Sequence, residues 1–588
     1  MKYEILIKIL DQIRTEATTK YLKKYMPDQV NSELIDYARS RAYIHLFLKV
    51  SFGLLDFDER EHYITDGSYD GGIDGYYINS ENKTIYLIQS KFRTNSKNFE
   101  TKEIELEEIL AMDINRVLDG ELHDEAGNEY SGKIKQLQRE ISNIDDITRY
   151  SYKVIIIANL KKIQQAFLRR LTDGYAVEIF NYEKCYEKLV FPVITGTYFN
   201  ASDLNINIDL SNKNAGSKIS YSVKTKISEC EITVLFVPTI EIARIMNKYK
   251  NSILKYNPRS YLELDGQSIH KAIKETILQK ETNEFALYNN GITMLSEETN
   301  ITEKMGQKNR AKLTVKNPQI INGGQTSFTL SRIYEENIAR AEEIFNEKEV
   351  LLKVITLKDN DSDEQKLQFI DEISTATNKQ TPVINADKFA NDVLHQKLQH
   401  IIFDRYGLLY ERKRGEYADG LYNKYIDHNL IIERNLFLRI YYSANGLINK
   451  GIQKKLFQKN DLTSKILTDG VGLDRTFVGL KVFNALLDKK HPNQKTDKKI
   501  YALVYIYNQL YFDDYQKNGF ANFETNIKNV KQQWGDFVKA KLITLPKKRK
   551  VKVNKITGES EIIEIERKNF NYPNLEKDVR EYFSQKAQ

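Results

Sequence analysis

The sequence predicts a chain of mixed α/β class with three parts. The first is a mixed sheet flanked by helices, the second is a central α+β domain, and the third is a mostly helical region with a terminal hairpin. Two observations predict this order. Over roughly the first 200 residues, segments with helical spacing alternate with short apolar runs typical of strands, whereas residues 429–511 carry mainly helical spacing.

The length of the chain also favours several domains. Its 588 residues are too many for one hydrophobic core, and the length prior gives about three or four domains. We expect domains over residues 1–215, 216–425 and 426–588, since residues 201–220 are polar and rich in Asn and Ser, as linkers are. Apolar residues make up 41% of the chain, which excludes a largely disordered protein.

Charge and cysteine content narrow the class of protein. The 88 basic and 81 acidic side chains give a net charge of +7, an excess that is compatible with nucleic acid without demonstrating it. Two cysteines exclude a disulfide framework and a cysteine-based zinc site. No apolar run reaches the ~20 residues that a membrane helix needs. We therefore expect a cytoplasmic protein that does not bind membranes.

Two helices are predicted at the N-terminus. Residues 2–25 carry apolar side chains at helical spacing, and a second helix opens at Asn31 or Ser32, either of which can cap it. Glu33 lies in the first turn of that second helix, where a carboxylate complements the helix dipole. Farther along, residues 152–158 form a continuous apolar run, typical of a strand buried on both faces.

Residues 69–92 have the pattern of a β-hairpin, with β-branched and aromatic residues on both sides of a short polar break. Gln89 and Lys91 are two residues apart, so they point to the same face of their strand. Asp74 lies at the start of the neighbouring strand, and the hairpin can bring it beside them. A carboxylate, an amide and an ammonium group then converge at one edge of a sheet.

Such a group of side chains suits phosphodiester hydrolysis. Mg²⁺ prefers oxygen ligands, and Mn²⁺ can take its place. Asp74 would be the charged ligand, and the side-chain oxygen of Gln89 and the carbonyl of Ser90 would add neutral ones. Lys91 would orient an attacking water and stabilise charge that develops on the phosphate. Gln in place of Glu removes one negative charge, which weakens metal binding unless another carboxylate compensates.

The glycine-rich phrase at residues 70–74, followed by Asp74 and later by Gln89-Ser90-Lys91, resembles the PD-(D/E)xK nuclease core in its Mrr-like form. The resemblance implies a restriction-endonuclease-like mixed sheet. It also implies a metal-directed glutamate on the helix before the first core strand, which points to Glu33, with Glu59 and Glu61 as alternatives. The competing interpretation is an exposed hairpin with an incidental lysine.

Five phrases in the middle of the chain resemble the AIPR family, named for abortive-infection phage resistance. They cover residues 257–262, 285–293, 318–326, 373–383 and 410–415. Their order and spacing carry the resemblance, which extends over roughly residues 218–420. Members of this family are commonly fused to an N-terminal domain of the PD-(D/E)xK type, so the two resemblances support each other.

These phrases contain Asn-Gly pairs and polar side chains that can surround a phosphate, a nucleotide or a base edge. The competing interpretation is that Asn-Gly pairs only form hairpin turns and that buried amides tie loops together. The candidate ligand-binding or nucleic-acid-binding residues are Arg259, Asn290, Asn322, Gly323, Gly324, Gln325, Thr326, Asn378, Gln380, Arg412, Lys413 and Arg414.

The last segment begins with the basic phrase at residues 546–551 and continues to residue 565. Its pattern predicts a hairpin with one basic and one acidic strand, whose opposite charges pair across it. A basic edge that faces DNA is a better interpretation of this phrase than a nuclear import signal.

Three functions fit the sequence. The first is a Mg²⁺-dependent nuclease that cuts DNA in bacterial anti-phage defence, with Asp74, Gln89, Lys91 and Glu33 in its catalytic site. The second is an RNase or a nucleotide-gated toxic effector on the same fold, and the third is a non-catalytic nucleic-acid-binding protein. Cutting both strands of a duplex takes two sites, so a homodimer is expected. A phage-derived or nucleotide trigger is a further expected partner.

Overall fold

The computed structural model confirms the mixed α/β class. It describes residues 2–28, 31–80, 82–104, 112–160, 205–210, 219–226, 229–257, 268–302, 311–357, 393–413, 415–452, 464–487, 498–542, 548–553, 560–565 and 574–585, with most of 166–197 and 368–373. The chain forms two compact units, one of residues 1–381 with 413–428 and one of residues 382–412 with 429–588. The division into three domains stays a prediction.

The N-terminal sheet has the strand order β1-β2-β3-β4. Its strands are β1 (Gly75–Asn79), β2 (Thr84–Ser90), β3 (Ser151–Ile157) and β4 (Ala176–Phe180). The predicted hairpin is confirmed, because β1 and β2 pair in antiparallel register from Gly75 opposite Ile88 to Asn79 opposite Thr84. β3 runs parallel to β2 and to β4. The last four residues of β3 are buried, as predicted for its apolar run.

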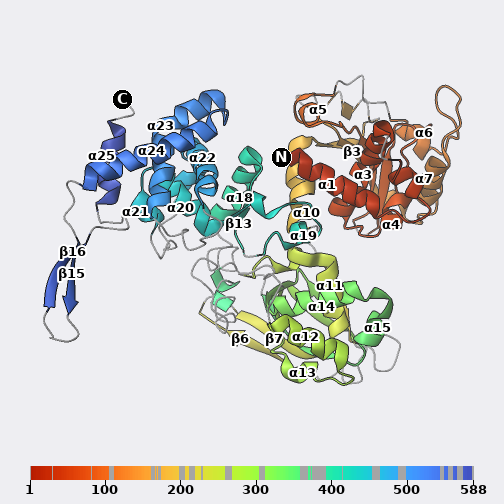
Figure 1. Cartoon of the computed structure of the whole chain (residues 1–588). Helices are drawn as coiled ribbons and strands as arrows, with labels where there is room; N and C mark the ends of the chain where they lie inside the picture. The colour runs from red at the N-terminus through yellow and green to blue at the C-terminus, as the bar shows by residue number, and fades with distance from the viewer. Residues whose placement is uncertain are drawn as a thin grey trace. The chain divides into compact units, whose positions relative to one another are not determined.

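Helices cover both faces of this sheet (Figure 1). On one face, Ile134, Leu137 and Ile141 of α7 share a buried core with Tyr76, Leu87, Val154 and Ile156 of the strands. On the other face, the Phe47 ring of α3 lies 5.0 Å from that of Phe180, and the Phe52 ring lies 4.3 Å from that of Tyr77. The helices of this region are α1 (Lys2–Thr15), α2 (Leu22–Tyr25), α3 (Ser32–Phe52), α4 (Phe57–His62), α5 (Ser96–Thr101), α6 (Ile114–Leu118), α7 (Gly132–Ser142), α9 (Tyr182–Cys185) and α10 (Phe191–Thr195).

Helix α3 begins where a capping side chain is available. Of the two predicted caps, Asn31 is the one used, because its Oδ1 accepts a hydrogen bond of 3.2 Å from the Leu34 N–H. The helix ends at Gly53, which takes the left-handed conformation that favours glycine.

The central part of the first unit is built on a five-stranded sheet of order β11-β8-β12-β7-β6. These strands are β6 (Ile219–Lys224), β7 (Glu229–Pro238), β8 (Ile292–Ser296), β11 (Gln319–Asn322) and β12 (Glu349–Leu357). A three-stranded sheet contains β5 (Asn205–Asp209), β10 (Lys312–Lys316) and β9 (Glu298–Thr302). The helices here are α11 (Thr239–Tyr249), α12 (Ser268–Gln279), α13 (Phe285–Tyr288), α14 (Gly324–Glu336), α15 (Ala341–Ile344) and α19 (Ala418–Tyr422). Since β5 lies within residues 201–220, the prediction of a linker is wrong for residues 205–209, which form a strand instead.

The second unit is mostly helical, as predicted. Its helices include α18 (Val393–Tyr406), α20 (Arg434–Ala444), α21 (Ile448–Gly451), α22 (Gly470–Leu486), α23 (Lys498–Asn518), α24 (Phe523–Leu542) and α25 (Leu575–Ser584). Strands β13 (Leu409–Glu411) and β14 (Ile431–Glu433) pair in parallel. The predicted terminal hairpin is formed by β15 (Lys548–Val553) and β16 (Ser560–Ile565), with Arg549 opposite Glu564 and Lys552 opposite Glu561.

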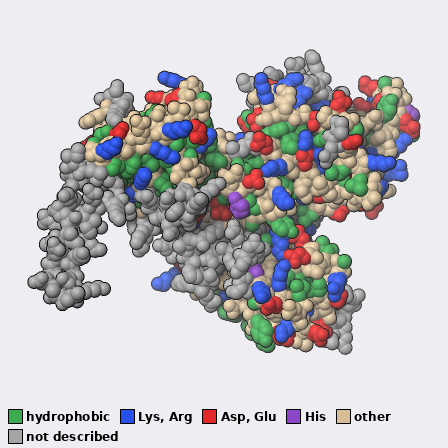
Figure 2. Space-filling view, in the orientation of Figure 1, with side chains coloured by type: hydrophobic (Ala, Val, Ile, Leu, Met, Phe, Trp, Pro, Cys, Tyr) green, Lys and Arg blue, Asp and Glu red, His purple; other side chains and the backbone are tan. Residues whose placement is uncertain are grey.

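Charged side chains are distributed widely over the surface. On the face that Figure 2 shows, blue basic and red acidic side chains are interspersed on the described parts of the chain. Among the described residues, no helix is both long enough and apolar enough to span a bilayer.

We predict that Leu137→Ala destabilises the N-terminal sheet by roughly 2–5 kcal/mol, because it leaves a cavity beneath α7. Arg139 is exposed on the same helix, so Arg139→Ala should change stability by no more than about 0.5 kcal/mol. Urea unfolding followed by circular dichroism measures both. Equal effects of the two substitutions would contradict this packing.

Candidate metal centre

The loop before β1 is shaped by two successive glycines. Gly71 and Gly72 have φ values of +61° and +72°, a conformation that glycine adopts at little cost. This turn folds the loop back on Asp70, whose Oδ1 accepts a hydrogen bond of 2.9 Å from the Gly72 N–H. The Oδ2 atom of Asp70 accepts a second one, of 3.0 Å, from the Gly67 N–H. The glycine-rich phrase therefore fixes the position of a buried carboxylate.

Asp74 joins this loop to the end of β2. Its Oδ2 accepts a hydrogen bond of 2.6 Å from the Ser90 N–H, and its own N–H donates to the Ile88 carbonyl at 2.8 Å. The Asp74 carbonyl in turn accepts from the backbone N–H groups of Thr65, at 3.1 Å, and Asp66, at 3.0 Å. The same residue thus holds both the strand end and the chain segment that carries Asp66.

The result is a group of three carboxylates, Asp66, Asp70 and Asp74. One oxygen of each lies within 4.8 Å of the others, an arrangement that could hold a metal ion. Asp70 and Asp74 are buried, whereas Asp66 is partly exposed. Asp70 belongs to the phrase noted in the sequence, but Asp66 does not, because it precedes the glycines in an irregular loop with no periodic pattern.

The burial of these carboxylates changes their electrostatics. Burial, with the nearby charges of Asp66 and Asp70, raises the pKa of Asp74 to about 7, against the opposing effects of the Ser90 N–H and the Lys91 ammonium. Burial likewise raises the pKa of Asp70, although the Gly67 and Gly72 N–H groups oppose it. A divalent cation would offset this accumulation of negative charge.

The structure brings Gln89, Ser90 and Lys91 to the same place as Asp74. Gln89 is 1% exposed, and its Nε2 donates a hydrogen bond of 3.1 Å to the carbonyl of Gly72, in the loop that carries the carboxylates. The Lys91 N–H donates to the Ile157 carbonyl of β3 at 2.9 Å. Its side chain is half-buried, and its charge acts on both Asp70 and Asp74. The predicted convergence is therefore present, and the catalytic roles of these residues stay predictions.

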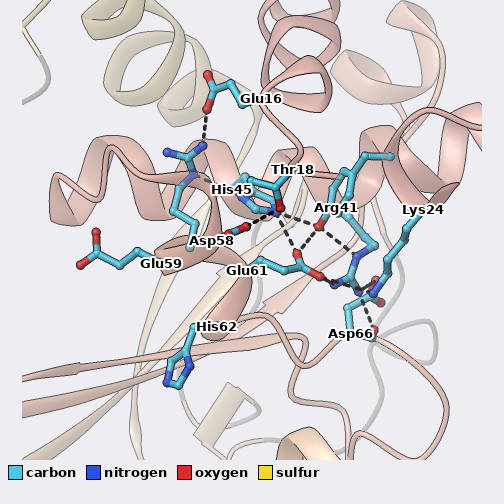
Figure 3. A network of polar contacts seen from close by, with 12 residues as sticks. Glu16, Thr18, Lys24, Arg41, His45, Asp58, Glu59, Glu61, His62 and Asp66 are labelled. Carbon is cyan, nitrogen blue, oxygen red and sulfur yellow. Dashed lines mark hydrogen bonds and ion pairs between the residues drawn. The ribbon is translucent and has the colours of Figure 1, made fainter. Parts of the chain in front are cut away.

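The predicted second carboxylate, Glu33, lies exposed in the first turn of α3. The group of three that the structure describes contains Asp66 and Asp70 beside Asp74 instead. The two alternatives lie on α4. Glu59 points away from Asp66, and Glu61 is buried in a network of polar contacts (Figure 3). A metal-binding role for Glu33 stays a prediction.

The central phrases meet in the structure through their glycines. Gly323 has φ +85°, and a Cβ added there would lie 3.0 Å from the Gly291 carbonyl oxygen. Gly291 has φ +82°, and its Cβ would lie 2.8 Å from the carbonyl oxygen of Leu351. These glycines are therefore required by close backbone packing between the end of β11, the start of β8 and β12.

Polar side chains beside these glycines tie the two turns together. The Asn289 Oδ1 accepts from the Gly291 N–H at 2.9 Å, and its Nδ2 donates to the Thr326 Oγ1 at 3.1 Å. The Asn322 Oδ1 accepts from the Gly323 N–H at 2.7 Å. Asn290 is exposed, and Gly324, Gln325 and Thr326 are half-buried in the first turn of α14. Contacts of these residues with a ligand or with nucleic acid stay predictions.

Lys413 is buried and hydrogen-bonded to backbone carbonyl groups. It is 3% exposed, and its Nζ donates to the carbonyl oxygens of Leu254, at 3.1 Å, and Lys255, at 2.5 Å. The carbonyl of its neighbour Arg412 accepts from Arg434 at 2.8 Å. The other predicted binding residues, Arg259, Asn378, Gln380 and Arg414, lie outside the described residues.

Comparison with protein-family models identifies the family of this chain. The family model described as AIPR protein matches residues 254–568, which is more than half of the chain. The chain belongs to the AIPR family. This family is named for abortive-infection phage resistance, so the chain belongs among anti-phage defence proteins. The matched range leaves out the three carboxylates and β1 to β4. No curated protein and no solved structure matches the chain.

We predict that Gly323→Ala destabilises the central sheet of this AIPR protein by at least about 1 kcal/mol, because alanine is strained at a φ of +85° and its Cβ would press on Gly291. Gly132→Ala provides the control, since a Cβ there would meet open space and the φ is not positive. Thermal unfolding compares the two variants. A Gly323→Ala protein as stable as the Gly132→Ala protein would disprove the packing role.

We also predict a pH dependence of stability that depends on Asp74. Because the pKa of Asp74 is raised from its usual 3.8 to about 7, the metal-free folded protein binds a proton in this window that the unfolded chain lacks. Stability should therefore fall as pH rises through the window, by up to about 1.4 kcal/mol per unit. Asp74→Asn should remove most of this slope. Urea unfolding in EDTA at several pH values measures it.

The control for this prediction is Asp119→Asn, since Asp119 is an exposed aspartate of the same region. It should keep the wild-type slope. A slope that Asp74→Asn leaves unchanged would mean that the carboxylate does not titrate as the buried geometry requires.

Proposed function

We propose that this AIPR protein is a Mg²⁺-dependent nuclease that cuts DNA in anti-phage defence. The observation that carries the proposal is the meeting of Asp66, Asp70 and Asp74 with Gln89 and Lys91 at the end of β2. A cluster of three carboxylates beside a lysine, at the edge of a mixed sheet, suits the hydrolysis of a phosphodiester. The alternative RNase activity uses the same residues and differs only in the substrate.

The residues present fit a hard divalent cation. They supply carboxylate oxygens, which Mg²⁺ and Mn²⁺ prefer. Burial, with the neighbouring Asp66 and Asp70, raises the pKa of Asp74, and a cation would stabilise its ionised form. Asp74 would hold the ion together with Asp70 and Asp66, and the Gln89 side-chain oxygen and the Ser90 carbonyl are the proposed neutral ligands. When bound, the metal would supply a polarised phosphate oxygen and a more acidic water.

The chain's own groups have distinct tasks in this proposal. The Lys91 ammonium, whose charge acts on Asp70 and Asp74, would hold the attacking water and offset charge on the phosphate. The Ser90 N–H keeps Asp74 turned toward the site. Gln89 fixes the glycine turn through the Gly72 carbonyl, so the loop keeps its carboxylates together.

Membership of the AIPR family supports the biological setting. Cleavage of nucleic acid is a direct means of stopping a phage, and the family part of the chain, residues 254–568, would then recognise substrate or control the nuclease. We propose a homodimer as the form that cuts duplex DNA and a phage-derived or nucleotide signal as its trigger.

We predict that the purified chain cuts supercoiled plasmid in Mg²⁺ or Mn²⁺, and that Asp74→Ala and Lys91→Ala each abolish cutting, because they remove the central ligand and the ammonium beside it. Losses of about 10²-fold or more are expected for removal of such groups. Linear duplex and single-stranded RNA, tested in parallel, identify the substrate. Glu33→Ala tests whether that exposed glutamate takes part.

Asp119→Ala is the control for this experiment, since it removes an exposed carboxylate of the same region. It should cut like the wild type. Cleavage that persists in both Asp74→Ala and Lys91→Ala would place the active site elsewhere or trace it to a contaminating nuclease. A protein that cuts nothing yet protects cells from phage equally well with and without these substitutions would favour the non-catalytic function.

A further inference from the structure

Asp66, the partly exposed member of the carboxylate group, accepts hydrogen bonds from a buried arginine, Arg41. Arg41 of α3 is 1% exposed, and its Nη1 donates to both the backbone carbonyl of Asp66, at 2.6 Å, and its Oδ2, at 3.0 Å. The Nη2 atom of the same guanidinium donates to the Glu61 Oε1 at 2.9 Å. Figure 3 shows Arg41 lying between Glu61 and Asp66, so one side chain joins α3, α4 and the acidic loop.

Glu61 is itself anchored on its other side. Its Oε2 accepts from the Tyr25 hydroxyl and lies 3.1 Å from the His45 Nε2. The Arg41 Nε donates to the same Tyr25 hydroxyl at 3.2 Å. Although burial raises the pKa of Glu61, the hydrogen bond with His45, the charge of Arg41 and the Tyr25 hydroxyl hold it at about 2. Glu61 is thus a fixed anion that orients the guanidinium.

We propose that Arg41 is a positioning residue of the metal centre, with Glu61 as its anchor. This inference rests on the proposed function, since it concerns the same carboxylates. Asp66 lies in an irregular loop with 24% of its side chain exposed, and two neighbouring carboxylates repel it. The contacts from Arg41 fix both the backbone and the carboxylate of Asp66, and so hold this residue beside Asp70 and Asp74. Partners of this kind that orient metal ligands typically affect metal affinity strongly.

The geometry requires arginine at this position. A guanidinium presents several N–H donors in one rigid plane, so it can bind Glu61 along one edge and Asp66 along another. Lysine has the same charge but a single nitrogen, which cannot reproduce the set of contacts to both acids. Arg41→Lys therefore changes orientation while the net charge beside the metal centre stays the same.

A second buried arginine provides a matched control. Arg60 of α4 is 0% exposed and donates to the carbonyl oxygens of Leu54, at 2.8 Å, and Leu55, at 2.6 Å. It also pairs with Glu16. Its Nε donates to the His45 Nδ1 at 3.2 Å, so it reaches Glu61 only through the His45 ring. Arg60→Lys makes the same chemical change at the same depth without removing a direct contact to Glu61 or Asp66.

The test is a Mn²⁺ titration of the full-length protein after EDTA treatment, followed by calorimetry, with thermal unfolding of each variant as the check on folding. We expect Arg41→Lys to weaken Mn²⁺ binding about 10- to 100-fold. Arg60→Lys should leave the affinity close to the wild-type value even where it lowers the unfolding temperature. Glu61→Gln, which keeps the shape of the anchor and removes its charge, should weaken binding in the same direction as Arg41→Lys.

The outcomes separate this inference from the proposed function. In the wild type, Mn²⁺ binding that Asp74→Ala abolishes supports the metal centre. If such binding exists and neither Arg41→Lys nor Glu61→Gln weakens it more than Arg60→Lys, the positioning role is overturned and the nuclease proposal stands. If Arg41→Lys does not fold, Glu61→Gln decides by the same criterion. If the wild type shows no binding that depends on Asp74, the metal centre fails, and the positioning role fails with it.

Discussion

Repulsion among Asp66, Asp70 and Asp74 is the constraint that shapes the N-terminal part of the chain. Three carboxylates whose oxygens lie within 4.8 Å of one another repel one another, and two of them are buried, so each needs a donor that faces it. Backbone N–H groups serve Asp70 and Asp74, and the guanidinium of Arg41 serves Asp66. The hairpin, the glycine turn and α3 each supply one of these hydrogen-bond donors and so fix the loop. An arrangement with this electrostatic cost is typical of functional sites rather than of stable surfaces.

The part of this centre that was predictable follows from local rules. Strand periodicity and a short polar turn were enough to bring Asp74 beside Gln89 and Lys91. The contributions of Asp66 and Arg41 were not predictable, because one lies in an irregular loop and the other on a helix, far apart in sequence, with no spacing that connects them. Long-range contacts of this type are determined by tertiary packing, which a single sequence does not display.

In the AIPR-matched part of the chain, sequence alone could not distinguish binding residues from packing residues. The glycines of the central phrases could equally line an anion site or permit close packing, and the structure shows the packing directly for Gly291 and Gly323. The basic phrase around Lys413 has the composition of a nucleic-acid contact, yet its ammonium is buried against two backbone carbonyls. Sequence reports the type of a side chain, whereas its exposure decides which partner it can meet. The elements themselves were easier to predict, since residues 429–511 have clear helical spacing and the terminal hairpin has one basic and one acidic strand.

A crystal structure of the protein soaked in Mn²⁺, with anomalous scattering recorded for manganese, tests the metal centre most directly. We expect an anomalous peak bonded to Asp74 and to at least one of Asp70 and Asp66, beside the end of β2. That peak should be absent from Asp74→Ala crystals grown in the same way. An ordered site at these residues with no manganese, or manganese bound only at other residues, would contradict the metal centre and the nuclease mechanism built on it.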